Sequence, residues 1–211
     1  MTRRARWGVA AAVVVVLAAA GGAWLWLASG SPAAREPAPP SSPSPSSPAY
    51  ALDVTLRRVK AIPVSGTVKK QKLRAPAEAV RQTFTDLYAT AFVDPARWEG
   101  GAFPGLFVHF APAAREEARR HLDDLTLGPA AEHVSAVRPE WARLDVRFLL
   151  GPARVPVAAQ ASMRFAATAF AGDGTEVPVR HRGDYVLERL EGRWLVVSYR
   201  VDGGFGPKAL Q

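Results

Sequence analysis

Apolar residues recur with a helical period over residues 76–94. Between Val80 and Phe92 they fall at the positions that share one face of a helix, while charged and amide side chains occupy the other face. The apolar positions are Val80, Phe84, Leu87, Tyr88, Ala91 and Phe92. Pro76 suits the first turn of a helix, and Asp94-Pro95 ends it because the residue before a proline avoids helical geometry. The pattern predicts one strongly amphipathic helix.

A second helix is predicted between Pro112 and Gly128-Pro129. Its first turns carry Glu116 and Glu117, where the helix dipole favours acidic side chains. Small and apolar residues line one face at Ala114, Ala118, Leu122 and Leu125. Between the two helices, a segment interrupted by glycines, residues 96–110, carries several aromatic residues.

After residue 140 the period of the apolar positions changes from about 3.6 to 2. This alternation predicts strands over 142–150, 155–169, 175–190 and 193–202, with turns at Gly172-Asp173-Gly174 and Glu191-Gly192. Residues 132–137 could join the sheet, and 52–56 read as a short further strand. Helices followed by a curved antiparallel sheet indicate an α+β fold.

The sequence leaves two alternatives for which side chains of the last predicted strand face the helices. A change of one residue in the hairpin turn reverses which side chains face inward. Either Trp194, Val196 and Ser198 or, alternatively, Leu195, Val197 and Tyr199 line the inner face.

The composition narrows the class of protein. Hydrophobic residues make up 48% of the 211 and charged residues 22%, which suits a folded domain with extensions. The chain has no cysteine, which excludes disulfides, thiolate zinc sites, cysteine nucleophiles and a lipid-anchored cysteine.

The N-terminal region predicts a membrane anchor. Residues 8–28 carry no charge and are long enough to span a bilayer as a helix. Because Arg3, Arg4 and Arg6 precede them, the positive-inside rule places the N-terminus in the cytoplasm and the remainder outside. A cleaved signal peptide is the alternative, although the apolar stretch is longer than the usual signal core.

A linker and a basic arm follow the predicted anchor. Residues 29–50 include seven prolines and seven serines, which is typical of a semi-rigid spacer. The net charge of the chain is +8, and residues 51–74 alone contribute +6. Their basic side chains are Arg57, Arg58, Lys60, Lys69, Lys70, Lys72 and Arg74. They indicate either a solvated edge strand or a contact with anionic lipid or wall polymer. Nucleic acid is not expected, because no aromatic residues are interleaved with these charges.

The order of elements resembles the nuclear transport factor 2-like (SnoaL-like) superfamily, over roughly residues 75–203. The resemblance depends on the helix with Phe84, Tyr88 and Phe92, and on the closing hairpin that holds Gly192-Arg193-Trp194. More narrowly, the chain is similar to actinobacterial membrane-anchored proteins of the mammalian-cell-entry-associated type. The resemblance implies helices packed in the concave face of a bent sheet, with an opening that enzymes of the superfamily use as a pocket.

Candidate chemistry is sparse. His181 shares strand parity with Tyr185 and is predicted to face the helices, where a buried imidazole could act as an acid or base. The candidate pocket residues are His181, Tyr88, Phe84 and Tyr199. His121 and Asp124 lie one helical turn apart, but a metal site needs more ligands. No catalytic residue, cofactor or metal is therefore assigned.

These features divide the chain into five predicted parts. They are a cytoplasmic stub and transmembrane anchor (1–28), a Pro/Ser-rich linker (29–50), a basic arm or strand (51–74), a cone-like domain (75–203) and a tail (204–211). We expect a single-pass protein of a bacterial cell envelope whose extracytoplasmic domain is a non-catalytic interaction or scaffold module with an envelope protein partner. The alternatives are a small-molecule binder or isomerase-like enzyme that uses the cone interior, and a component that works through its N-terminal helix.

Overall fold

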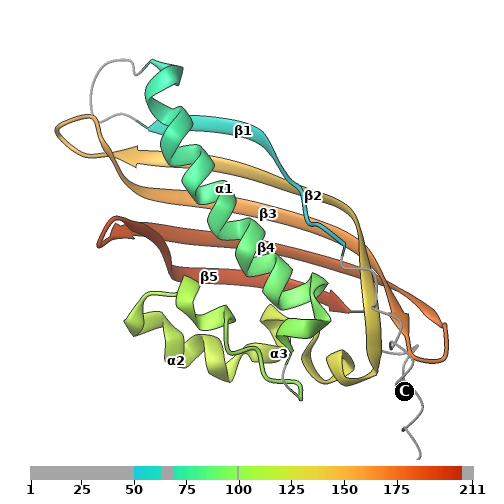
Figure 1. The fold of residues 1–211 in the computed structure, drawn as a ribbon. Coiled ribbons are helices and arrows are strands. Elements are labelled where there is room, and N and C mark those ends of the chain that lie inside the picture. Colours follow the sequence, from blue (N-terminus) through green and yellow to red (C-terminus); the bar gives the residue numbers. More distant parts are fainter. Residues whose placement is uncertain (1–49, 63–68, 99, 206–211) are drawn as a thin grey trace, which may run out of the picture. The chain divides into compact units, whose positions relative to one another are not determined.

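The computed structural model describes residues 50–62, 69–98 and 100–205. Five strands form one mixed sheet in the order β1-β2-β3-β4-β5, and helices cover one of its faces (Figure 1). The strands are β1 (Val54–Ile62), β2 (Val134–Leu150), β3 (Pro156–Ala171), β4 (Glu176–Leu190) and β5 (Arg193–Phe205). The predicted α+β fold with a curved sheet is confirmed.

The sheet combines a meander with one parallel edge strand. Strands β2 to β5 pair antiparallel in chain order, as the alternation predicted. Residues 134–137 belong to the start of β2, so they extend that strand and do not form a separate one. β1 pairs parallel to β2, because the chain crosses over through the helices before it returns to the sheet.

The first helix forms where it was predicted and is longer. A 3-10 turn, η1 (Lys70–Leu73), leads into α1 (Arg74–Tyr88), which continues as a π-helical turn, η2 (Ala89–Val93). The helix ends before Asp94, whose side chain accepts a hydrogen bond from the backbone N–H of Ala96. All six predicted apolar positions of this helix are buried.

The second helix differs from the prediction of one continuous segment. It is split into α2 (Pro112–Arg120) and α3 (Leu122–Leu125). The break lies at His121, whose φ of −108° and ψ of 30° do not continue the helical ladder. Short 3-10 turns, η3 (Pro95–Arg97), η4 (Leu106–His109) and η5 (Gly128–His133), complete the helical part.

A bulge in β5 answers the question of which side chains of the last strand face inward. Val186 pairs with Ser198 but Leu187 pairs with Val196, so Val197 is an extra residue on β5. Trp194 and Val196 face the helices before the bulge, and Tyr199 faces them after it. Neither predicted alternative is correct on its own, because the bulge reverses the alternation within the strand.

The two faces of the sheet have opposite character. On β3 every second residue from Ala159 to Ala171 is buried, and the intervening side chains other than that of Ala166, Arg164 among them, are more exposed. α1 and α3 pack on the same inner face, since both contact His181 of β4.

The predicted anchor and linker, residues 1–49, lie outside the described residues, as do 63–68, 99 and 206–211. No helix among the described residues has the length and apolarity needed to cross a membrane.

Candidate functional site

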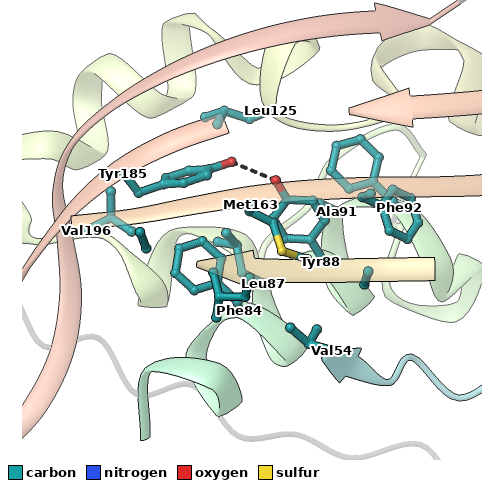
Figure 2. Close-up of a cluster of buried hydrophobic side chains, with 14 of the residues drawn as sticks. Val54, Phe84, Leu87, Tyr88, Ala91, Phe92, Leu125, Met163, Tyr185 and Val196 are labelled. Atoms are coloured by element: carbon teal, nitrogen blue, oxygen red, sulfur yellow. Dashed lines mark hydrogen bonds between the residues drawn. The ribbon is translucent and has the colours of Figure 1, made fainter. Parts of the chain in front are cut away.

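His181 lies at the centre of a buried hydrogen-bonded network on the inner face. It comes from the middle of β4 and is 4% exposed. Its Nε2 is 3.1 Å from the backbone carbonyl oxygen of Asp124, and its Nδ1 is 2.8 Å from the hydroxyl of Tyr88. The Tyr88 hydroxyl is in turn 3.1 Å from that of Tyr185, which Figure 2 shows as a dashed line.

The backbone carbonyl of Asp124 determines the direction of each hydrogen bond in this network. A carbonyl oxygen only accepts, so Nε2 of His181 donates to Asp124 and carries the proton of the neutral ring. Nδ1 then accepts from Tyr88, and Tyr88 accepts from Tyr185. Both ring nitrogens of His181 and the hydroxyl protons of Tyr88 and Tyr185 therefore take part in hydrogen bonds within the protein.

Burial holds these three side chains in their neutral forms. Desolvation lowers the pKa of His181 to about 4, and it raises the pKa of Tyr88 and of Tyr185 well above their usual value. The imidazole is therefore uncharged near neutral pH. A neutral histidine whose two nitrogens are both engaged acts as a structural group unless a ligand breaks one of its hydrogen bonds.

Aromatic rings fill the space around the network. Phe84 and Tyr185 meet edge to face with ring centroids 5.0 Å apart, and Phe92 lies 4.7 Å from the imidazole of His181. Phe165 completes the packing at 5.5 Å from Phe92 and 5.6 Å from Tyr88. Figure 2 shows Phe84 and Tyr88 of α1, Phe92 of η2 and Tyr185 of β4 in one cluster. Side chains thus occupy the interior that the predicted pocket required.

Tyr199, the fourth candidate pocket residue, makes no side-chain hydrogen bond to His181, Tyr88 or Tyr185. Its ring packs edge to face against Phe110 with centroids 5.6 Å apart. Its hydroxyl is buried and has no hydrogen-bond partner among the described residues. Desolvation, with the carboxylates of Glu117 and Asp124 nearby, raises the pKa of Tyr199 to about 12.

The predicted basic arm is divided between two elements. Arg57, Arg58 and Lys60 are exposed on β1. Lys69 just before η1, Lys70 and Lys72 within it, and Arg74 at the start of α1 are also exposed. A register shift between Leu56 and Arg58 makes Arg57 the bulged residue and turns Arg58 and Lys60 to the outer face. The seven basic side chains therefore come from two separate elements and not from one continuous arm.

A second basic cluster, on the outer face of the sheet, was missed by sequence reasoning. Arg143 of β2 pairs with Arg164 of β3, and Arg164 pairs with Arg182 of β4. Beside this row lies a depression of about 220 Å³. Its polar and charged lining comes from Arg58, Asp145, Arg147, Gln160, Ser162, Arg164 and Arg182. The alternation indicated that the lining residues of each strand from β2 to β4 share a face, but only the register shows which are neighbours, and only the bulge in β1 adds Arg58 to them.

Other ionisable groups give no metal centre. His121 and Asp124 approach to 3.5 Å as an exposed pair, Nδ1 to Oδ2. Within residues 50–62, 69–98 and 100–205, no group of three potential histidine or carboxylate ligands comes together.

Comparisons with known proteins leave the family open. No protein family model and no curated protein matches this sequence. A similar solved structure is a protein from Xanthomonas campestris described as a calcium/calmodulin dependent protein kinase II association domain. The two sequences are 13% identical, and the match covers 65% of this chain and 89% of that one with a TM-score of 0.37. A match at this level carries no argument about family or function.

Proposed function

We propose that this chain is a membrane-anchored, extracytoplasmic interaction or scaffold protein of a bacterial cell envelope, and that its domain acts without catalysis through its outer surface. The observation that carries the proposal is the filled interior. Phe84, Tyr88, Phe92 and Phe165 are each 0–1% exposed, and the polar groups of His181 are used within the protein. A domain whose concave side is occupied by its own side chains has its outer surface left for contact.

The location and the finer relationship are part of the same proposal. The apolar stretch at residues 8–28 and the preceding arginines support a single-pass anchor with a cytoplasmic N-terminus. Helices packed on one face of a curved sheet support membership of the nuclear transport factor 2-like superfamily. Its place among actinobacterial mammalian-cell-entry-associated-type proteins is proposed from the resemblance of the sequence alone. The partner would be another envelope protein.

A second candidate function is a small-molecule binder or isomerase-like enzyme, and one observation favours it. His181, Tyr88 and Tyr185 form a chain of proton donors and acceptors in an apolar setting, which is a group set that acid–base chemistry uses. For this function a ligand would have to displace aromatic side chains and break a hydrogen bond of the network.

Crosslinking in intact cells separates the two candidates. A photo-reactive side chain at exposed Val108 or Val186 should capture a defined envelope protein, and protease added outside spheroplasts should degrade the domain. Tyr88→Phe keeps the ring and removes the hydroxyl, so a non-catalytic module should retain the same capture. Loss of function in Tyr88→Phe with a folded domain would instead favour chemistry in the interior.

A further inference from the structure

The outer face of the sheet carries three rows of side chains that the strand register places across neighbouring strands. The first row runs Thr55, Arg143, Arg164, Arg182 and Asp202. The second runs Arg58, Asp145, Ser162, Asp184 and Arg200, and the third Lys60, Arg147, Gln160, Val186 and Ser198. Seven of these side chains are basic and three are acidic, which gives a net charge of +4. No described helix covers this face (Figure 1).

Three arginines stand directly opposite one another in the first row. Neighbouring strands are about 4.8 Å apart, and like charges in opposed positions of a sheet are destabilising. Among the described residues, no carboxylate lies within ion-pair distance of Arg143, Arg164 or Arg182. The nearby carboxylate of Asp184 is engaged by the hydroxyl of Ser162 at 2.5 Å. The fold therefore keeps a group of arginines together without neutralising them.

The depression beside this row concentrates hydrogen-bond donors around a small volume. Arg58, Arg147, Arg164 and Arg182 border it, with Asp145 as its one acidic side chain. Each guanidinium presents planar, forked donors that match the oxygens of phosphate or carboxylate. Four such groups offer more donors than the two oxygens of a carboxylate accept, whereas a terminal phosphate offers three strong acceptor oxygens. The space of about 220 Å³ is of the size of a phosphate-bearing group and not of a large apolar ligand.

We propose that the outer face of the sheet is a binding site for a soluble phosphate-bearing ligand, held at the depression that Arg58, Arg147, Arg164 and Arg182 surround. This inference deepens the proposed function and rests on it, because it assigns a ligand chemistry to the outer surface. Gln160 and Ser162 add uncharged polar groups to the lining of the depression.

Two other occupants fit the face less well. A second copy of the chain packed through this face would bring two surfaces of net positive charge together, at a cost in free energy. A lipid bilayer would gain from apolar side chains at the contact, yet Val186 is the single exposed large apolar residue in the three rows. The exposed apolar residues Ile62, Leu149, Val155 and Val157 gather instead toward the β2–β3 turn.

The test is calorimetric titration of the full chain, in an uncharged detergent at physiological ionic strength, with sodium tripolyphosphate. The variant Arg164→Gln/Arg182→Gln should weaken binding at least roughly tenfold, since two charge-assisted contacts are lost. The matched control Arg120→Gln/Arg189→Gln removes the same charge from exposed positions outside the depression and should bind within about twofold of the native chain. Binding of the native chain should also weaken as salt is added.

Four results would overturn this proposal. They are no binding by the native chain, an equal loss in the control variant, binding to phosphatidylglycerol vesicles without binding to tripolyphosphate, and a native dimer in sedimentation that Arg164→Gln/Arg182→Gln dissociates. Because the titration uses the purified chain, it is independent of the crosslinking in cells. Tripolyphosphate binding without a captured envelope partner would contradict the scaffold role and leave the anion site standing.

Discussion

The inner and outer faces of this sheet are built from alternate residues of the same strands, yet they handle polar groups in opposite ways. On the inner face His181, Tyr88 and Tyr185 satisfy one another and are packed in aromatic rings. On the outer face Arg143, Arg164 and Arg182 are left without an acidic partner among the described residues. An unpaired charge costs much free energy in a protein interior and little in water. Only the outer face can therefore keep unpaired charges that are available to a ligand.

The largest expected effect is the removal of an inner aromatic ring. Phe84→Ala should destabilise the domain by about 3–5 kcal/mol, because it leaves a cavity beside Tyr185 that the surrounding rings cannot close. Chemical denaturation with a matched outer-face variant, Arg164→Gln, measures the contrast. A cost below about 1 kcal/mol for Phe84→Ala would mean that the interior is loosely packed and has room for a ligand.

A pH dependence of stability should come from His181. Its folded pKa of about 4 lies below the ordinary value of 6.5, so between these two pH values the unfolded chain binds a proton that the folded chain does not. Stability from this group is therefore full above pH 6.5 and is lost as pH falls toward 4, by roughly 3 kcal/mol in total.

The comparison of native chain and His181→Asn isolates this effect from that of the carboxylates. The free energy of unfolding at pH 7 and at pH 4.5 should differ less in the variant than in the native chain. Equal differences in the two proteins would show that the imidazole is not held neutral by burial.

Gly183→Ala should have an intermediate effect on the inner face. A Cβ at this position of β4 would lie 2.7 Å from Cζ and from the hydroxyl oxygen of Tyr185. Since Phe84 and Tyr88 hold that ring in place, the overpacking should cost about 1–3 kcal/mol. Gly172→Ala, where nothing lies within 4 Å of the added Cβ, is the control and should change the unfolding free energy by less than about 0.5 kcal/mol.

The smallest expected effect belongs to the outer face and has the opposite sign. Arg164→Gln relieves repulsion from Arg143 and Arg182 and should leave stability unchanged or raise it by up to about 0.5 kcal/mol. Thermal unfolding at low and high salt is the measurement, and the gain should shrink as salt screens the charges. A clear loss of stability would show that Arg164 makes a structural contact, and the contrast between the two faces would then fail.

Much of the inner face could be predicted from the sequence. The positions of Val80, Phe84 and Tyr88 in one helical stripe, and the parity of His181 with Tyr185, depend only on the periods of helix and strand. The break at His121 could not be predicted, because no glycine or proline marks it between Ala113 and Leu125. The bulge at Val197 could not be predicted either, since a bulge depends on pairing with β4.

The sequence by itself determined the class of fold, the buried side of the first helix and the inward facing of His181, since these follow from periodicity along one segment. Only the tertiary structure decided which side chains are neighbours. Along the chain the basic charge is concentrated in residues 51–74, and the remainder to residue 211 is slightly acidic. The register of three strand pairs brings Arg58 of that segment beside Arg147, Arg164 and Arg182 of a near-neutral one. Pairing across strands is non-local, so a cluster made by it leaves no mark on any single stretch of sequence.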